Sequence, residues 1–211
     1  FPLPQPPCCA NPRPSPMLRL IALLVLTLLP CVAGAENHRA SVEVTAALPR
    51  ADAWAVLSDF SLAHNYVPDL VRTEIVSSKQ RGIGAHRRVY DEEGGYLEET
   101  IVEWIEGEGF VIRLHDGEEP LTPFRHIEFI YALADSGPAA TRIELALVFD
   151  MPWGWLGDYL AQWFIVPMME DNLVQVAAGM KYFYETGNRA TDEDRQREAA
   201  AVQVLPAAIV D

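Results

Sequence analysis

The sequence predicts an α+β fold in which a curved antiparallel sheet of about seven strands wraps around one long C-terminal helix. Segments between residues 39 and 150 alternate apolar and polar side chains and are separated by turn residues, as half-buried strands are. The run Pro152–Glu185 is strongly apolar, and its second half repeats apolar residues in steps of three and four. A helix this apolar needs a large surface to cover it. The strands are that surface, and a cavity is expected between sheet and helix.

The first half of the domain predicts one strand, two short helices and a second strand. His38–Ala47 alternates and is expected to be a strand. Pro49 suits the first turn of a helix. Ser61 could cap a second short helix, which must end before Pro68 because a residue before proline avoids the helical region. Leu70–Ser78 is expected to be the second strand.

Five further strands are expected, joined by short turns that favour antiparallel pairing. They are Ala85–Asp91, Tyr96–Glu106, Phe110–His115, Phe124–Leu133 and Thr141–Met151. Pro167 lies inside the long helix and is predicted to kink it. Gly187 suits the end of that helix. Residues 188–211 are charged and alanine-rich. Thr191–Ala201 could form a transient helix, but the tail as a whole is expected to be disordered.

The N-terminal region indicates a secretion signal. Residues 1–16 are proline-rich and indicate a disordered or non-native leader. Residues 17–35 combine a basic residue, an apolar stretch and a small-residue cleavage site, as a signal peptide does. The expected product is one domain, residues 36–187 with its tail, in the periplasm or secreted. The alternative is that the apolar stretch stays as a membrane anchor, although Pro30 interrupts it short of a full bilayer span. Pro30 also makes Cys31 a poor lipidation site.

Composition excludes several classes of function. All three cysteines, Cys8, Cys9 and Cys31, precede the expected cleavage site, so the mature domain has no cysteine for a zinc site or a disulfide. The net charge of the full chain is −14, and the mature domain is more acidic because Arg13 and Arg19 also precede the cut. Such acidity argues against nucleic acid and against anionic membrane surfaces as partners.

Three motifs resemble those of a known superfamily. The stretch Trp54-Ala-Val-Leu-Ser-Asp59-Phe60, the turn Gly82-Ile-Gly84-Ala-His-Arg87 and the strand Glu99-Thr-Ile-Val-Glu-Trp104 are similar to segments of START-like (SRPBCC) helix-grip proteins. That superfamily includes the polyketide cyclase/dehydrase and coenzyme-Q-binding families, and the resemblance covers residues 39–187. It implies a cavity for an apolar small molecule or lipid. We expect no cofactor and no metal. A secretion signal fits poorly with a role beside a cytosolic polyketide synthase or in mitochondria.

Arg87 and Glu99 are the pair that stands out among the polar residues. If the hairpin joins Asp91 to Gly95, Arg87 faces Glu99 across two neighbouring strands. On the cavity face the pair would be buried and could orient a polar ligand group. On the outer face it would be an ordinary salt bridge of little energetic consequence. We expect the outer position, because exposed pairs are the commoner kind.

The expected cavity lining combines this pair with aromatic and methionine side chains. Tyr131 is the candidate for a polar ligand contact because a buried phenol needs a partner. Methionines on the long helix adapt to variable apolar ligands. The candidate ligand-binding residues are Trp54, Arg87, Glu99, Phe129, Tyr131, Phe149, Trp163, Met169 and Met180.

The histidines are weaker candidates. His126 and Glu128 share one face of a strand and could bind a metal with His86 or His115. The apolar residues between them define the opposite, buried face, so the pair is expected in solvent. His64 lies where this fold often opens its cavity, but an exposed loop position is the expected one.

Three functions remain open. The first is a binding or transport protein for a hydrophobic molecule, such as a lipid or isoprenoid quinone. The second is a polyketide cyclase/dehydrase-like enzyme using cavity residues such as Glu99, His64 or Tyr131 as acid and base, since no standard catalytic motif occurs. The third is a module that docks a protein through residues 153–169. The same segment could touch a membrane transiently, although it has no basic face.

Overall fold

The computed structural model describes residues 37–210, which belong to one compact unit, Ala35–Asp211. The predicted leader, signal peptide and alternative anchor lie outside the described residues. No helix within residues 37–210 is both long enough and apolar enough to cross a bilayer.

All strands join one antiparallel sheet of ten strands in the order β10-β1-β8-β7-β5-β4-β3-β2, with β6 paired to β5 and β9 to β1. The strands are β1 Asn37–Ala46, β2 Leu70–Ile75, β3 His86–Asp91, β4 Tyr96–Ile105, β5 Gly109–Asp116, β6 Glu119–Pro120, β7 His126–Asp135, β8 Thr141–Asp150, β9 Gln203–Val204 and β10 Ala208–Val210. The α+β prediction is confirmed, with a few more strands than expected.

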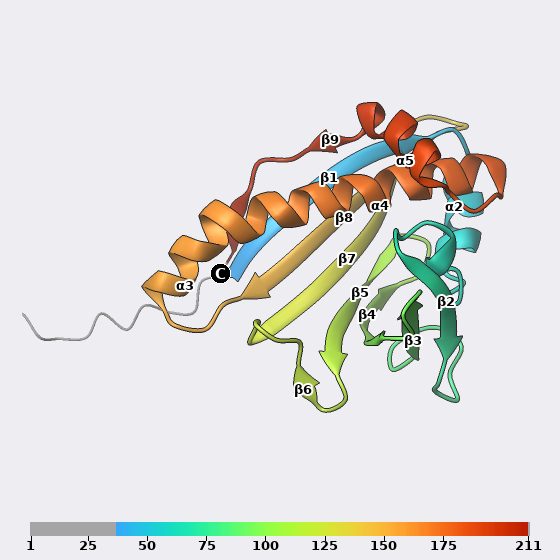
Figure 1. Ribbon diagram of the computed structural model, residues 1–211. Helices are drawn as coiled ribbons and strands as arrows, with labels where there is room; N and C mark the ends of the chain where they lie inside the picture. The colour runs from blue at the N-terminus through green and yellow to red at the C-terminus, as the bar shows by residue number, and fades with distance from the viewer. Residues whose placement is uncertain (1–36, 211) are drawn as a thin grey trace, which may run out of the picture. The chain divides into compact units, whose positions relative to one another are not determined.

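Two short helices follow β1, and the longest helix follows β8 (Figure 1). The helices are α2 Arg50–Leu57, the 3₁₀ turn η1 Ala63–Asn65, α3 Trp155–Leu160, the π-helical turn η2 Ala161–Ile165, α4 Val166–Thr186, α5 Asp192–Glu198 and the 3₁₀ turn η3 Ala199–Ala201. The predicted order of elements from the first strand to the long helix is therefore confirmed.

The core lies between the sheet and α4. Helix α4 runs along β1 and β8 (Figure 1), and its stripe of Leu173, Val176 and Met180 is buried. The facing strand β8 contributes the alternating residues Ile143, Leu145, Leu147 and Phe149, all buried. These side chains belong to one continuous hydrophobic cluster. Burial of the two apolar patterns against each other is the main stabilisation of the fold.

Pro167 lies in the first turn of α4, within a helical run that continues from α3 through η2. Ile165 and Val166 before it have helical backbone angles. The π-helical turn η2 immediately precedes it and joins α3 to α4. The polypeptide thus avoids a clash that a proline in the middle of a regular helix would cause.

The prediction of a disordered tail is wrong for the described residues 188–210. Thr191 and Asp194 form a capping box that starts α5, with each side chain accepting from the other residue's backbone N–H. Buried Arg195 donates to the carbonyl oxygen of Ala190 at 2.9 Å. Beyond α5 the chain pairs with the outer edge of β1 through β9 and β10. Composition suggested disorder, but the capping signal is present in the sequence.

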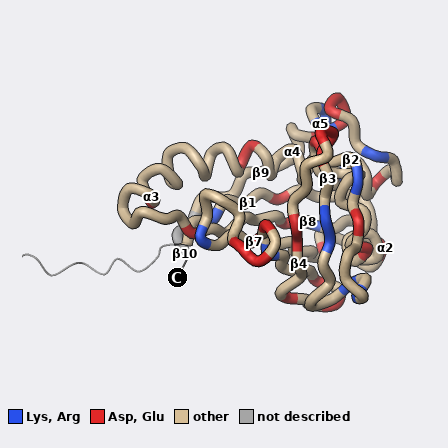
Figure 2. Tube along the Cα trace, turned by 60° about the horizontal axis from the view of Figure 1, so that its bottom comes forward, with Lys and Arg blue, Asp and Glu red and all other residues tan. Residues whose placement is uncertain are grey.

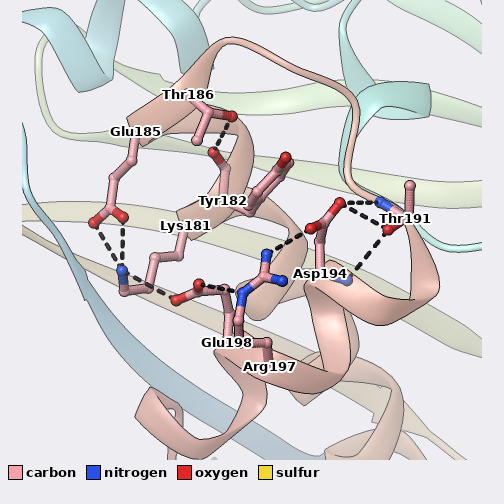
Figure 3. A network of polar contacts seen from close by, with 8 residues as sticks. All are labelled: Lys181, Tyr182, Glu185, Thr186, Thr191, Asp194, Arg197 and Glu198. Atoms are coloured by element: carbon pink, nitrogen blue, oxygen red, sulfur yellow. Dashed lines mark hydrogen bonds and ion pairs between the residues drawn. The ribbon is translucent and has the colours of Figure 1, made fainter.

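A network of charges fixes α5 to α4 (Figure 3). Lys181 of α4 lies 2.7 Å from Glu185 on its own helix and 3.2 Å from Glu198. Arg197 pairs with Asp194 at 2.5 Å. The hydroxyl and amide of Thr191, together with Arg197, lower the pKa of Asp194 to about 2.

We expect α5 to loosen as the pH falls from about 4 toward 2. A carboxylate whose pKa is depressed by folding stabilises the fold above its ordinary pKa, and this contribution is lost as the pH falls through the lowered value. Hydrogen exchange at the amides of α5 is the measurement. Thr191→Val should speed exchange at pH 6 and weaken the acid-dependent step, because the Thr191 amide and Arg197 still bind Asp194. Unchanged protection of α5 down to pH 2 would contradict the assigned cap.

Candidate ligand-binding site

Arg87 on β3 and Glu99 on β4 pair as the hairpin register predicts, with Asp91 joined to Gly95. The guanidinium Nε donates to the Glu99 carboxylate at 2.5 Å. The expectation of an exposed pair is wrong, because Arg87 is 1% and Glu99 8% exposed. Residues at two-residue spacing share a face of the sheet. The neighbours of the pair on that face are apolar, so the face is the inner one.

The loop after α2 completes the surroundings of Arg87. Its Nη1 donates to the carbonyl oxygen of Phe60 at 2.7 Å, and its guanidinium carbon lies 3.9 Å from the centre of the Phe60 ring. Burial alone would lower the pKa of Arg87, but the Glu99 carboxylate, Tyr66 and Tyr131 together raise it above its usual value. The side chain is therefore a fixed, permanent cation inside the domain.

Three tyrosines gather near this pair: Tyr66 after η1, Tyr131 on β7 and Tyr184 on α4. All three are buried. Burial raises the pKa of Tyr66, although the nearby charge of Arg87 opposes the shift. Burial also raises the pKa of Tyr131 and Tyr184 well above the usual range. The nearby Tyr66 raises both pKa values further. Their phenols stay protonated at neutral pH and can donate hydrogen bonds.

The hydroxyl of Tyr184 is buried and has no hydrogen-bond partner among residues 37–210. Its ring lies 6.5 Å from the ring of Tyr66, nearly perpendicular to it. Gly179, one and a half turns earlier on α4, allows this approach. A Cβ atom at Gly179 would overlap the backbone carbonyl oxygen of Tyr66. The glycine therefore lets the helix lie directly against the segment that carries Tyr66.

Aromatic rings from neighbouring strands surround the polar cluster, which we define as Arg87, Glu99, Tyr66, Tyr131 and Tyr184. The rings of Phe129 and Tyr131 stack with centres 4.5 Å apart, and Phe110 lies 5.0 Å from Tyr131. Such an apolar wall makes each polar interaction in the cluster stronger.

Several hollows border the sheet. One of about 310 Å³ lies along β4, β5 and β7 and includes Phe110 and Tyr131 in its wall. One of about 490 Å³ borders Trp54 beside the β7–β8 turn. A third, of about 410 Å³, lies where β5 and β7 diverge, and polar residues line most of it. Tyr131 borders the first hollow, but Val111, Ile130 and Ala132 in the same wall alternate with Phe110 and Tyr131 along their strands and lie on the opposite, outer face of the sheet.

The remaining predicted residues fall in different places. Phe149 and Met180 are fully buried in the core, and Met169 is half-buried against it. Trp54 is buried and donates from Nε1 to Glu106 at 3.0 Å. Trp163 was expected to line the cavity, but it is 65% exposed on η2 and lies outside the cluster. An apolar residue on a helix is buried only if its side of the helix faces another element.

The histidines do not join the cluster. His126 pairs with Glu128 at 3.1 Å on the solvent side of β7, as predicted. His86 and His115 lie near Glu98 on the opposite face of the sheet from Arg87. Among residues 37–210, no group of His, Cys, Asp and Glu side chains is arranged to hold a metal ion.

His64 is half-buried and contacts the Thr73 hydroxyl through Nδ1 at 3.1 Å. Its pKa is lowered by burial and by the nearby Arg189, so the ring is neutral at pH 7.

From the sequence, Tyr66 is only a possible gate residue and Tyr184 a core aromatic, and Phe60 does not stand out as a site residue. Tyr184 lies four residues after Met180 and so continues the buried stripe of α4, which is a readable signal. Tyr66 and Phe60 lie in a loop whose path only the tertiary structure shows.

The cluster offers three protonated phenols and one guanidinium as hydrogen-bond donors. Its carboxylate, Glu99, is already bound by Arg87. This arrangement suits a neutral or partly negative oxygen on an otherwise apolar molecule. The cluster is less suited to proton abstraction, because its base, Glu99, already accepts a hydrogen bond from the permanent cation Arg87.

Comparison with known proteins agrees with the observed fold. The sequence model of a family described as polyketide cyclase / dehydrase and lipid transport matches residues 37–181. No protein of curated function matches the sequence.

Solved structures share the fold at low identity. A START superfamily protein from Mycobacterium smegmatis is 17% identical, with a TM-score of 0.53 over 69% of this chain and 95% of that one. The Zhui aromatase/cyclase from a Streptomyces species is 17% identical, with a TM-score of 0.54 over 70% and 93%. The protein Ara h 8.0201 is 18% identical, with a TM-score of 0.52 over 70% and 97%.

Proposed function

Because the chain belongs to the polyketide cyclase / dehydrase and lipid transport family, we propose that it binds an apolar small molecule or lipid through a polar oxygen. The polar cluster receives that oxygen, and the aromatic wall around Tyr131 contacts the apolar part. An isoprenoid quinone, with carbonyl oxygens on an apolar ring and chain, is a ligand of this chemistry. The expected location is the periplasm or the medium, where such a protein would carry its ligand between membranes.

The observation that carries the proposal is the unpartnered hydroxyl of Tyr184. A buried polar group without a partner costs about 1–3 kcal/mol, and phenylalanine would fill the same space without that cost. Among residues 37–210 the hydroxyl has no hydrogen-bond partner, so its proton is available to a ligand. A ligand oxygen entering the cluster would accept from it and remove the cost.

Tyr184→Phe tests the proposal because stability and binding should move in opposite directions. The ligand-free variant should gain about 1 kcal/mol in free energy of unfolding, since an unsatisfied group is removed. Its affinity for ligand should fall about tenfold through the lost hydrogen bond. Urea unfolding of extracted protein measures the first effect, and native mass spectrometry of protein from its own host measures the second.

Tyr182→Phe is the matched control, because Tyr182 is on the same helix and half-exposed. It should change neither quantity. A Tyr184→Phe variant that loses stability and keeps full ligand occupancy would show that the hydroxyl has a partner within the protein.

Acid–base catalysis is the second candidate, favoured by the carboxylate of Glu99 lying in the same buried cluster as three phenols. It predicts product formation from a polyketide-like substrate and a collapse of turnover in Tyr131→Phe with binding retained. Binding without turnover in the same assay would support the carrier function instead.

A further inference from the structure

Seven large apolar side chains stand exposed just before α3 and along α3, η2 and the start of α4. We call this set the aromatic face. It consists of Trp153, Trp155, Leu156, Tyr159, Trp163, Phe164 and Met168. Trp155 is 78% exposed, and the set includes three of the five tryptophans of the chain. Exposed apolar patches of this kind mark interaction sites.

The opposite side of the same segment is anchored, so the aromatic face is the side left uncovered. Gly157 and Ala161 are buried, and a Cβ atom at Gly157 would overlap the carbonyl oxygen of Pro152. Asp158 is held by His38 of β1, with Oδ1 and Nε2 3.4 Å apart. These contacts orient the segment and leave its large side chains in solvent.

The backbone conformation of Trp153 is a second indication that the aromatic face is an interaction site. Its φ of 78° is in the left-handed region, which is unfavourable for a bulky residue. Glycine or asparagine would suit this backbone better. A large aromatic residue at a strained and exposed position indicates a role for the side chain itself.

The lack of charged residues around the aromatic face limits the kind of surface it can bind. Residues 153–169 contain one charged residue, Asp158, and no lysine or arginine, and Figure 2 shows the α3 region almost entirely in tan. The segment offers nothing to attract anionic lipid headgroups. Tryptophan and tyrosine are the residues enriched where bilayers meet water, because each joins an apolar ring to a polar group.

The position of the aromatic face connects it to the apolar stretch in the sequence. β1 begins at Asn37, and the next residue, His38, contacts Asp158 of α3. The apolar stretch of residues 20–35 ends two positions before Asn37. Two residues span at most about 7 Å. The described domain therefore begins beside α3, where His38 contacts Asp158.

We propose that the aromatic face inserts into the interface of a zwitterionic lipid bilayer. The three exposed tryptophans enter the headgroup region, and the α3 end of the domain faces the membrane. This inference does not depend on the polar cluster or on the identity of its ligand.

The test uses the full chain with vesicles of phosphatidylcholine, some carrying bromine on the acyl chains, which quenches nearby tryptophan fluorescence. Trp54 and Trp104 are packed against each other in the domain, with ring centres 4.9 Å apart. Their fluorescence should therefore not be quenched by the brominated lipid. We expect strong quenching in the native protein and its loss in Trp153→Phe/Trp155→Phe/Trp163→Phe, which should still sediment with vesicles. Trp155→Ser/Trp163→Ser should reduce vesicle partitioning at least about tenfold in protein from which residues 1–35 have been cleaved.

Three further results test the proposal. Trp153→Gly should raise the urea midpoint, because it relieves the left-handed strain, and should also weaken vesicle binding. Sedimentation without tryptophan quenching would mean that the N-terminal stretch alone binds lipid, and would overturn the proposal. If substitutions in the aromatic face dissociate a dimer or a protein complex in the absence of lipid, the face binds a protein partner instead.

Discussion

Glu99→Gln should lower the free energy of unfolding by about 3–5 kcal/mol, the cost of breaking a buried ion pair by removing one partner. Glutamine keeps the size of the side chain and can still accept one hydrogen bond, so the loss reflects charge. Arg87 is 1% exposed and would remain a cation with no counter-charge in an apolar, aromatic setting. Urea unfolding at pH 7, followed by circular dichroism, measures the change.

Glu144→Gln is the matched control. Glu144 pairs with Arg39 at 2.9 Å between two strands, but both side chains are partly exposed to solvent. Water screens such a pair, so its loss should cost less than about 1 kcal/mol. A comparable effect from the two variants would mean that solvent reaches Arg87.

The double variant Arg87→Met/Glu99→Leu separates stability from binding. Apolar replacement of a whole buried pair is often neutral or stabilising, so most of the lost stability should return. Ligand binding should remain weak, because the double variant has lost the charged pair that contacts the ligand oxygen. If the double variant folds and keeps full ligand occupancy, Arg87 is not part of the binding site. Tyr184 could still be part of it.

The pairing of Arg87 with Glu99 was predictable because a short turn fixes strand register. Once Asp91 joins Gly95, every opposite pair along β3 and β4 follows. The inner position of the pair was also implied by its apolar neighbours on the same face. The apolar neighbours of a charged pair are therefore a better guide to its burial than the general rarity of buried ion pairs.

The helix segments show where sequence patterns fail. The stripe of Leu173, Val176 and Met180 predicts burial correctly because the sheet covers that side of α4. Trp163 is just as apolar, but Ala161 and Gly157 face the domain in its place. Hydrophobicity shows that a residue favours burial, whereas the packing of small residues decides which side of a helix obtains it.

The candidate site was half predictable. Arg87, Glu99 and Tyr131 belong to strands whose spacing can be read from the chain, and they do meet in the structure. Tyr66 and Tyr184 come from a loop and a helix more than one hundred residues apart in sequence. Their meeting depends on the close approach of α4 to the η1 segment, which one glycine permits.

Gly179→Ala tests that approach and should destabilise the protein by about 1–3 kcal/mol, as overpacking of a close contact does. The new methyl group would overlap the carbonyl oxygen of Tyr66, so helix and loop would have to separate. Alanine alone favours a helix by about 1 kcal/mol over glycine, so without the contact the sign would reverse. Chemical unfolding of both proteins measures the difference.

Asn172→Ala, at an exposed position on the same helix, is the control for helix propensity and should be neutral or slightly stabilising. Separation of the helix from the loop should also move Tyr184 away from Tyr66 and lower ligand occupancy. Stabilisation by Gly179→Ala would show that α4 does not lie against the η1 segment, and the polar cluster would then lose its arrangement. Destabilisation with reduced binding would show that this one close contact positions the tyrosines of the site.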